Sequence, residues 1–598
     1  MNIYNTMQSP WLRDVSRACS SGCCPNAFVG FPDSKAALTS EIPGSAAAAS
    51  RHQFEVCTVN SLYPNSQFTN HESLPPLEES LSCFKKVYPR YSETEQADRI
   101  RADEYNHLSL SKHVCLDYIG HGLFAYSQLQ TQHPESTFFD ISYKSVNLNS
   151  HVLHDGTGTG TGEESEFQSG IRKRIMAFMN ISETDYSMVL TANQSSAFKL
   201  LSECYPFQSG QNLVTVYDYQ SEAVEVMIES SKKRGANVLS ADFSWPNLQI
   251  QTEKLRKKLV SKSKNKRRGL FVFPLQSWVT GSRYSYLWMS LAQENGWHVL
   301  LDASALGAKD METLGLSIFN PDFLICTFFM VFGQNPSGFC CLFIKKSSAE
   351  ILKVPATSVG VVHLVPVPAR IVDEFPVQHD NDESSRELQT PQGTEQNSKT
   401  GSLSEIQQVM DTSPGIECRS LDHADSIGLI QISSRTRNLI NWLVNALMSL
   451  RHPNSENGIP AVKIYGPKIV FDRGPAVAFN VFDWKGERID PALVQKLADR
   501  NNISLSIGFL QHIWFSDKRE EKELVLETRT SGFERTVSSK KREKLGTGIP
   551  VVTAALSFLT DFEDIYRVWA FVSRFLDAEF LEREKWRYKA LNQKTLQV

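Results

Sequence analysis

The sequence predicts an α/β protein with a large doubly wound, mainly parallel sheet and a smaller C-terminal α+β unit. Two observations lead to this prediction. Short apolar runs alternate with longer amphipathic segments up to about residue 345, which is the pattern of parallel strands connected by helices. Beyond an acidic stretch the pattern changes to strongly apolar helices around one strand-like run, which indicates a separate unit.

The strands of the large sheet are expected at five apolar runs that are short enough to be buried strands. In chain order these runs are Leu213–Val216, Gly269–Phe273, His298–Leu301, Asp322–Cys326 and Phe339–Ile344. Amphipathic helices are expected between several of them. The segment Glu222–Arg234 is one example, because it places Val224, Met227 and Ile228 on one helical face.

The smaller unit is expected to consist of helices that flank a strand at Ala476–Phe482. Its first helix carries leucines at helical spacing, namely Leu439, Leu443, Leu447 and Leu450. Thr560 and Glu563 have the spacing of a capping box, so a second helix is predicted to begin there.

Composition divides the chain into four predicted parts. Residues 1–85 lack sustained periodicity and form a disordered or targeting tail, and residues 86–371 form the large unit. Residues 372–415 are acidic, poor in aromatic residues and predicted to be a disordered linker. Residues 416–598 form the small unit.

Charge and composition exclude several classes of function. A net charge of -4 gives no general attraction to nucleic acid, and no apolar stretch has the length of a membrane helix. The eleven cysteines are scattered without the spacing of a metal site, which favours a reducing compartment. We therefore expect a cytoplasmic protein, with a plastid as the alternative because the first fifty residues are rich in Ser and Ala.

Several segments, taken in order, resemble the signature motifs of molybdenum cofactor sulfurases, above all those of plant sulfurase-like proteins that contain the N-terminal domain only. These segments are Cys115–Gly122, Phe273–Gly281, Leu300–Ala303, Thr327–Gly333 and Pro336–Gly338. The likeness extends over about residues 88–577. It implies the fold-type I architecture of class V aminotransferases and cysteine desulfurases, pyridoxal 5'-phosphate as cofactor, and a homodimer.

The resemblance places methionine at the position of the lysine that holds the cofactor. Pyridoxal phosphate needs an amine to form its Schiff base, and the motif position of that amine is Met330 here. A thioether forms no imine and takes up no proton. Covalent attachment of the cofactor is therefore not expected, and no catalytic residue is assigned.

Other cofactor contacts are implied at Asp302, Gln194, Ser195, Gln220 and Thr327. Asp302 matches the aspartate that pairs with the pyridine nitrogen, although a carboxylate that caps a strand-end turn explains it too. Gln194 and Ser195 stand in the phosphate-binding segment at a helix start, where an N-cap without ligand is the alternative. Gln220 takes the place of the ring-stacking histidine, and Thr327 opens the lysine motif.

Three further positions depart from the family pattern. Trp278 replaces an asparagine beside the expected cofactor ring, and Thr553 replaces an arginine that binds the substrate carboxylate. The segment Gly508–Trp514, with Phe509–Gln511 at its centre, contains no cysteine where the family carries its persulfide. Sulfur transfer requires a thiolate, so that step is predicted to be lost.

Three hypotheses follow for the function, and whether the protein is an enzyme stays open. In the first, the transferase fold survives in a catalytically degenerate pseudoenzyme. In the second, the protein is an active pyridoxal-phosphate-dependent transferase or lyase of altered specificity. In the third, it binds pyridoxal phosphate or another small anionic ligand without covalent chemistry.

Overall fold

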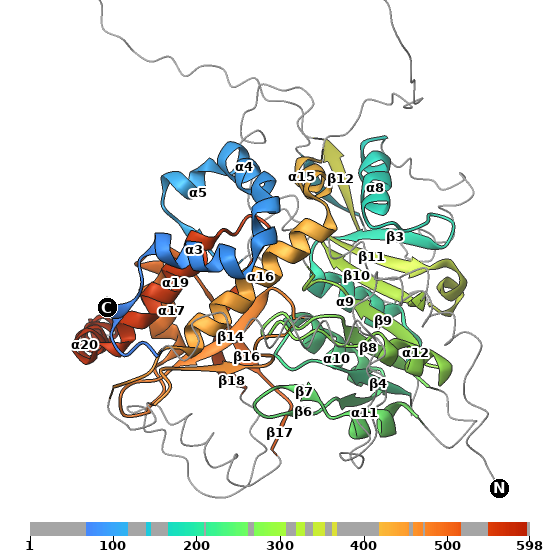
Figure 1. Cartoon of the computed structure of the whole chain (residues 1–598). Helices are drawn as coiled ribbons and strands as arrows, with labels where there is room; N and C mark the ends of the chain where they lie inside the picture. The colour runs from blue at the N-terminus through green and yellow to red at the C-terminus, as the bar shows by residue number, and fades with distance from the viewer. Residues whose placement is uncertain are drawn as a thin grey trace, which may run out of the picture.

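The structure is a computed structural model of the 598-residue chain (Figure 1). It describes residues 67–117, 139–144, 166–207, 211–260, 268–306, 319–328, 339–352, 361–366, 418–453, 459–470, 473–515 and 548–594. Two bodies of secondary structure lie side by side in Figure 1, and each has a hydrophobic core of its own.

Seven strands form the large sheet, in the order β3-β11-β10-β9-β8-β4-β5. The strands from β10 to β5 are parallel, whereas β11 runs antiparallel to both of its neighbours. Their bounds are Tyr186–Thr191 (β3), Asn212–Thr215 (β4), Asn237–Ser240 (β5), Leu270–Pro274 (β8), His298–Asp302 (β9), Phe323–Thr327 (β10) and Cys340–Lys345 (β11). Each predicted strand run coincides with one of these strands to within one residue at either end. The predicted mainly parallel sheet is therefore confirmed.

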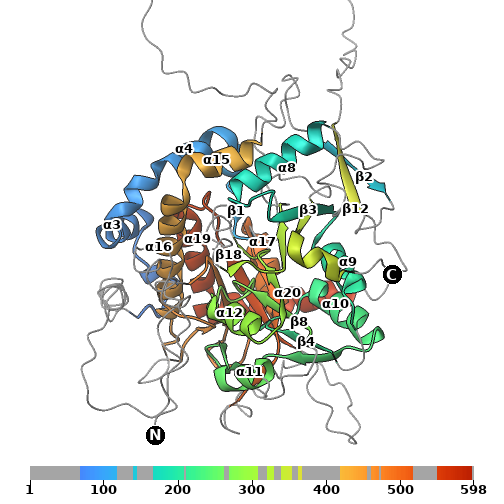
Figure 2. The ribbon, with the colours of Figure 1, turned by 90° about the vertical axis from the view of Figure 1, so that its right-hand side faces the viewer.

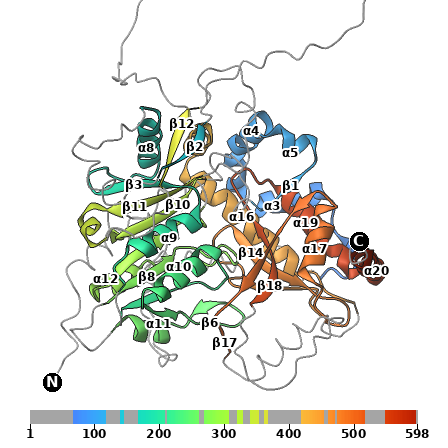
Figure 3. The same cartoon turned by 180° about the vertical axis from the view of Figure 1, so that it is seen from behind.

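Helices connect and cover these strands. They are α8 (Glu166–Phe178), α9 (Gln194–Cys204), α10 (Glu222–Lys233), α11 (Thr252–Leu259), α12 (Leu287–Glu294) and the 3-10 helix η4 (Lys346–Ile351). Figure 3 shows α9 and α10 packed together over one face of the sheet. Small sheets complete this body, formed by β2 (Phe139–Lys144) with β12 (Val361–Pro366) and by β6 (Phe243–Ser244) with β7 (Gln249–Ile250) and β17 (Ile513–Trp514).

The smaller unit has a four-stranded antiparallel sheet in the order β13-β14-β18-β16. These strands span Val462–Tyr465 (β13), Ala476–Val481 (β14), Ser506–Leu510 (β16) and Ile549–Ala555 (β18). The helices of this part are α16 (Leu429–Met448), α17 (Pro491–Asp499), α19 (Phe562–Ser573), η5 (Arg574–Leu576) and α20 (Ala578–Lys594), whereas α15 (Arg419–Ile427) buries its apolar side chains in the core of the large unit. This is the small α+β unit that the sequence predicts.

The first described helices contribute to both hydrophobic cores. They are η1 (His71–Ser73), α3 (Leu77–Val87), η2 (Pro89–Thr94), α4 (Glu95–Glu104) and α5 (Asn106–Leu110), followed by β1 (Val114–Cys115), which pairs with β15 (Ile503–Ser504). Figure 2 shows α3 and α4 beside α16. Phe84, Tyr88 and Tyr91 are buried among the apolar side chains of α16 and α19. Ala97 on α4 and Leu108 on α5 are buried instead in the core of the large unit.

The boundary predicted at residue 86 is therefore wrong in one respect. It assigned most of α3 to a disordered tail, although α3 is an ordered helix. The physical reason is that Phe84 of α3, with Tyr88 and Tyr91 after it, finds apolar partners in the second core, whereas Tyr105 and Leu108 pack in the first. The linker at 372–415 lies outside the described residues, and the other boundaries stay a prediction.

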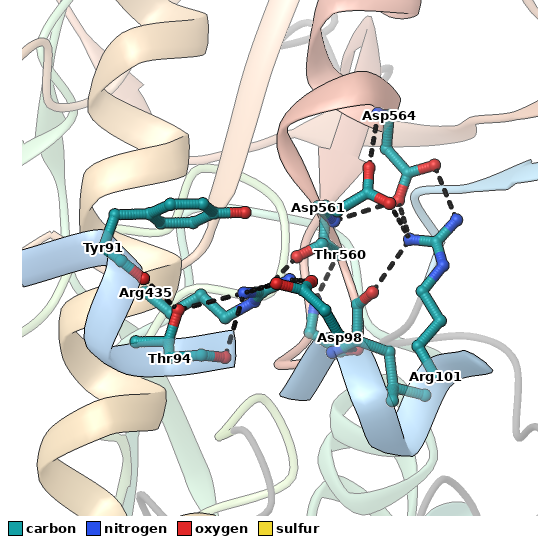
Figure 4. A network of polar contacts seen from close by, with 10 residues as sticks. Tyr91, Thr94, Asp98, Arg101, Arg435, Thr560, Asp561 and Asp564 are labelled. Atoms are coloured by element: carbon teal, nitrogen blue, oxygen red, sulfur yellow. Dashed lines mark hydrogen bonds and ion pairs between the residues drawn. The ribbon is translucent and has the colours of Figure 1, made fainter. Parts of the chain in front are cut away.

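Two buried arginines hold these N-terminal helices against the small unit (Figure 4). Arg101 on α4 donates to both carboxylate oxygens of Asp564 on α19, and Arg101 Nη1 lies 3.2 Å from an oxygen of Asp561. Arg435 on α16 donates to Asp98 on α4, and its Nε donates to the Thr560 carbonyl at 2.9 Å. We call these side chains the arginine clamp.

The N-cap of α19 differs from the one that was predicted. The capping box is formed by Asp561 and Asp564, whose side chains and backbone N–H groups bond reciprocally at 2.9 and 3.1 Å. The Thr560 hydroxyl instead accepts a hydrogen bond from the Ser557 N–H at 3.0 Å. The helix thus begins one residue later than the Thr560–Glu563 spacing suggests, because an aspartate is as good a cap as a threonine.

Within the described part of the chain, no helix is both long enough and apolar enough to cross a bilayer.

Candidate functional site

The polar side chains of the large unit gather where its parallel strands end. Asp302 is the last residue of β9, and it lies opposite Pro274 of β8 and Ile325 of β10. The carboxyl ends of the parallel strands meet at this edge, which is the usual place for a ligand in open α/β sheets. Thr327 ends β10 at the same edge.

Asp302 is buried, and side chains of the chain itself bond to it. The Tyr217 hydroxyl donates to one carboxylate oxygen at 2.8 Å, and the Gln194 amide lies 3.3 and 3.4 Å from the two oxygens. The Ser304 N–H donates to the other oxygen at 3.0 Å. Burial raises the pKa of Asp302, and these donors offset part of that rise because they favour the charged form.

Gln194 and Ser195 occupy the first turn of α9. The helix is capped by Asn193, whose side-chain oxygen accepts from the Ser196 N–H at 2.8 Å. Asparagine is a favoured N-cap because its oxygen satisfies an amide that has no partner within the helix. Asn193 is thus the cap, and Ser195 follows within the turn. The structure brings two of the implied contacts together, Gln194 and Asp302.

A second buried carboxylate lies near the same edge. Asp218 follows β4 and accepts hydrogen bonds from the hydroxyls of Ser277 at 2.6 Å and Thr280 at 2.9 Å. Burial raises the pKa of Asp218, and both hydroxyls act in the opposite direction. Among the residues that the structure describes, neither Asp218 nor Asp302 has a lysine, arginine or histidine within ion-pair distance.

The segment around Phe509–Gln511 is fixed to the large unit by its backbone. The Gln220 N–H donates to the Phe509 carbonyl and the Gln511 N–H donates to the Asp218 carbonyl, both at 2.8 Å. Further along, Phe243 N–H donates to the His512 carbonyl at 2.9 Å. We call residues 506–515 the strap, because this stretch connects the small sheet to the edge of the large one.

Gln220 itself points away from the buried acids. Its side chain is exposed and its amide donates to a carboxylate oxygen of Glu225 at 2.7 Å. The neighbouring Tyr219 is buried, and its ring contacts that of Tyr217 edge-on at 5.6 Å. The aromatic group in this stretch is therefore Tyr219, and Gln220 contributes its backbone to the strap.

Trp278 and Thr553 lie where the two units meet. Trp278 is partly buried and packs against Ala476 and Ala555 of the small sheet. Thr553 is buried in β18, opposite Ser506 of the strap. Both side chains therefore have packing roles here, whatever else they do.

Met330 lies outside the described residues, so its surroundings are known from sequence alone. Tyr217, Ser277 and Thr280, which bond to the buried carboxylates, were not predicted from the sequence as site residues. One available signal was position, because Tyr217 and Asp218 follow directly after a parallel strand, where site residues collect.

No described cysteine near Asp302 is suited to carry sulfur. Cys326, Cys340 and Cys341 are fully buried on β10 and β11, and burial raises the pKa of each thiol. Cys418 is also buried, and its pKa is raised to about 12. A persulfide carrier needs an accessible thiolate, so these cysteines are structural. Nor do the described residues contain a group of three or more metal-ligating side chains in contact.

Asp302 is the residue implied as the acceptor for a pyridinium nitrogen, and it already receives the hydroxyl of Tyr217, the amide of Gln194 and a backbone N–H. The position implied for the Schiff-base lysine lies outside the described residues. The buried edge is organised by neutral donors of the chain itself.

No family model matches the chain. Curated relatives do match. The molybdenum cofactor sulfurase of Bos taurus is 25% identical over 451 residues, which cover 71% of this chain and 46% of that protein. The Homo sapiens sulfurase is 27% identical over 433 residues, covering 68% and 43%. That of Solanum lycopersicum is 23% identical over 464 residues, covering 72% and 51%.

The resemblance to molybdenum cofactor sulfurases is thus confirmed as a sequence similarity, and the chain spans about half the length of these relatives. They come from animals as well as plants, so a closer likeness to plant proteins stays a prediction. Among solved structures, a cysteine desulfurase from Thermococcus onnurineus NA1 aligns with a TM-score of 0.48 at 15% identity, covering 80% of this chain and 98% of that one. The Escherichia coli cysteine desulfurase CsdA aligns with a TM-score of 0.47 at 13% identity, covering 80% and 98%.

Proposed function

We propose that this chain is a catalytically degenerate relative of the class V transferase domain of molybdenum cofactor sulfurases. In this proposal it keeps the transferase fold and has lost both Schiff-base formation and sulfur transfer. Its role is then to bind a ligand or a partner through that fold. The proposal rests on similarity at about a quarter identity and on the chain's own residues.

One observation carries the proposal: Met330 stands at the lysine position while neutral side chains of the chain bond to Asp302. In an active enzyme of this type, a carboxylate at this place would bond to the cofactor. Here Tyr217 and Gln194 supply the hydrogen bonds instead. The segment without cysteine supports the same proposal. It is part of the strap, and its backbone is hydrogen-bonded to that of Asp218 and Gln220.

The direct test is spectroscopic. Purified protein is incubated with excess pyridoxal phosphate, and its visible absorption and borohydride-trapped mass are recorded for the natural chain and for Met330→Lys. We expect neither protein to show an imine band, because the bulky Trp278 stands beside the expected cofactor ring in both. Cysteine is added to both, and no sulfide is expected.

The double variant Met330→Lys/Trp278→Asn is the matched control, since it restores two family positions together. An imine in this variant alone would mean that Trp278 blocks the site and would support degeneration by stepwise replacement. A pyridoxyl adduct on the natural chain together with amino-acid turnover would overturn the proposal. In that case the protein is an active transferase or lyase of altered specificity.

Noncovalent binding of pyridoxal phosphate or another small anion is the second candidate. The observation that favours it is the start of α9, where Gln194 and Ser195 lie at the positive end of an eleven-residue helix beside a buried carboxylate. A ligand that binds only the folded chain raises the thermal midpoint. No shift at saturating pyridoxal phosphate would remove this candidate.

The proposal includes a homodimer, carried over from the resemblance, and a cytoplasmic location, which the scattered cysteines favour. Light scattering on the purified chain tests the first, since a monomer at micromolar concentration would contradict it. Fluorescent tagging at the C-terminus tests the second, and accumulation in plastids would contradict it.

A further inference from the structure

Four arginines converge on the far side of the small unit, where α17, α19 and α20 end or begin. Arg500 follows α17, Arg574 follows α19, and Arg583 and Arg587 lie on α20. Figure 1 shows these helices together at the edge of the molecule that is remote from the large sheet. We call these four side chains the arginine cluster.

One nearly buried carboxylate joins three of its members. Glu584 is 5% exposed, and its oxygens lie 3.0 Å from Arg500 Nη1 and 2.7 Å from Arg587 Nη1. Arg583 Nε is 3.7 Å from the same carboxylate. A carboxylate has about four acceptor sites, whereas each guanidinium has five donors, so most of the donors are left for other partners.

Arg574, the fourth arginine of the cluster, contacts an aromatic ring and an asparagine side chain. Arg574 stacks over Phe580 with its guanidinium carbon 4.4 Å from the ring centroid, and its Nη1 donates to Asn501 at 2.9 Å. Arg583 also lies over Phe580, at 5.9 Å. Phe580 and Glu584 therefore fix the four guanidinium groups close to one another.

The balance of charge differs from that of the arginine clamp. In the clamp, Arg101 and Arg435 face Asp98, Asp561 and Asp564, so the carboxylates outnumber the arginines. In the cluster, Arg500, Arg583 and Arg587 share Glu584. Within the described part of the chain, Arg574 has an amide and a ring as partners and no carboxylate within ion-pair distance.

Ordinary structural roles account for only part of this arrangement. Arg500 and Arg574 stand at helix C-termini, where a cation is favoured by the helix dipole. Arg583 and Arg587 lie further along α20 and gain nothing from that effect. Their side chains are 56% and 48% exposed, and that of Arg500 is 59% exposed, so the cluster is open to solvent.

We propose that the arginine cluster binds a polyvalent oxyanion of the phosphate class. A guanidinium fork bonds two oxygens of a phosphate group at once, and neighbouring forks can share one group or bridge two. A polyvalent anion also offsets the mutual repulsion of the four cations, which Glu584 alone does not. The carboxylates of Asp577 and Glu579, at the start of α20, reduce the positive potential on one side of the arginine cluster. They therefore favour a compact ligand over an extended polyanion.

Trp586 provides a reporter beside the cluster. It is 71% exposed on α20, three residues after Arg583 and next to Arg587. Residues three apart on a helix are surface neighbours, so an anion bound by Arg583 alters the environment of this indole.

The test is isothermal titration of the full chain with inorganic pyrophosphate, with tryptophan fluorescence recorded in parallel. We expect saturable binding with one site per chain, a fluorescence change that Trp586→Phe removes, and weaker binding at high salt. The double variant Arg500→Ala/Arg587→Ala is expected to lose about tenfold or more in affinity, because two charge-assisted forks are removed.

The matched control is Arg90→Ala/Arg99→Ala, which removes two exposed arginines from the N-terminal helices and changes net charge equally. It is expected to change affinity less than about twofold, because surface charges beyond a Debye length are screened. Equal losses in both double variants would overturn the proposal, as would the absence of saturable binding. If Arg500→Ala/Arg587→Ala fails to fold, Arg500→Lys/Arg587→Lys replaces it, with a loss of at least about threefold expected because the forks are lost.

The phosphate group has two plausible sources, and separate titrations distinguish them. Free pyrophosphate is compared with vesicles of neutral lipid that contain a small fraction of a phosphorylated inositol lipid. Binding to pyrophosphate alone would show that the arginine cluster takes a soluble phosphate compound. Binding to the vesicles that depends on the cluster would show that it takes a lipid headgroup. Binding to neither would overturn the proposal.

Discussion

Buried carboxylates occur in two regions of this protein, and their surroundings are opposite. At the edge of the large sheet, Asp218 and Asp302 are bonded by hydroxyls, an amide and backbone N–H groups, and no described cation accompanies them. In the arginine clamp, Asp564 is paired through both oxygens with Arg101. Burial raises the pKa of both acids in the first region, whereas the acids of the second region lie against guanidinium groups.

This difference distinguishes a contact that joins helices from a candidate ligand site. A buried ion pair with good geometry holds two elements in register, and removing one partner leaves an uncompensated charge. A buried acid among neutral donors has a raised pKa, and this is the condition that groups in ligand sites often show. The clamp is accordingly assigned to the packing of helices, and the sheet edge remains the candidate site.

The largest effect is expected in the clamp. Arg101→Met should lower the free energy of unfolding by about 3–5 kcal/mol at pH 7, because the buried Asp564 and the partly buried Asp561 beside it then lack their cation. Urea denaturation followed by circular dichroism measures it. Burial and the neighbouring Asp564 raise the pKa of Asp561 to about 6, so the loss should shrink at pH 5, where this carboxyl is protonated.

Arg174→Met is the control for that variant. Arg174 also contacts two carboxylates, those of Asp422 and Asp425 at 2.7 and 2.6 Å, but these are 52% and 37% exposed. Its loss should cost less than about 1 kcal/mol. Equal costs for Arg101→Met and Arg174→Met would show that burial does not distinguish the clamp.

A smaller effect is expected at the sheet edge. Tyr217→Phe removes the hydroxyl that donates to Asp302 at 2.8 Å and should cost about 1–2 kcal/mol, since a buried acceptor loses one of several donors. It should also raise the pKa of Asp302 further, because a donor that favours the charged form is gone. Urea denaturation at pH 7 checks the cost. A cost as large as that of Arg101→Met would contradict the distinction between the two regions.

The smallest effect concerns pH. Asp218→Asn keeps the shape and one acceptor oxygen, so its cost at pH 5 should be under about 1 kcal/mol. Because the pKa of Asp218 is raised in the folded state, its stabilising contribution is complete below the unfolded value of about 3.9 and is lost as pH rises through the folded pKa. The free energy of unfolding of the natural chain should therefore fall as the pH rises through this range, and that of Asp218→Asn should fall less.

Urea denaturation from below the unfolded value of about pH 3.9 up to pH 8 measures this difference, with Asp242→Asn as a control at a partly exposed carboxylate. Parallel pH profiles for the natural chain and Asp218→Asn would contradict the raised pKa.

Local pattern was sufficient to predict most of the large sheet. Buried parallel strands are short, continuous apolar runs, so β8, β9 and β10 are visible in sequence as such. β3 was missed because its run from Tyr186 to Thr191 mixes polar and apolar residues, even though every one of them is buried. Its burial depends on β11, which pairs with it from the far end of the body.

The site was predicted less completely, for a related reason. Asp302 was found because a recognisable strand ends there, and Gln194 because it opens a helix. The strap was not found, because it depends on Tyr219 meeting Leu510, and no local pattern records such a distant pairing. The arginine clamp was not predicted from the sequence for the same reason, since Arg101 and Asp564 are 463 positions apart.

The packing of α3 and α4 against α16 and α19 also has a consequence for biosynthesis. These two helices leave the ribosome hundreds of residues before α19, against which Phe84 rests. Until then, the apolar side of α3 has no native surface to cover it, and contacts between such distant segments close slowly. The nascent chain is therefore expected to need chaperone protection from its first helix until its last has emerged.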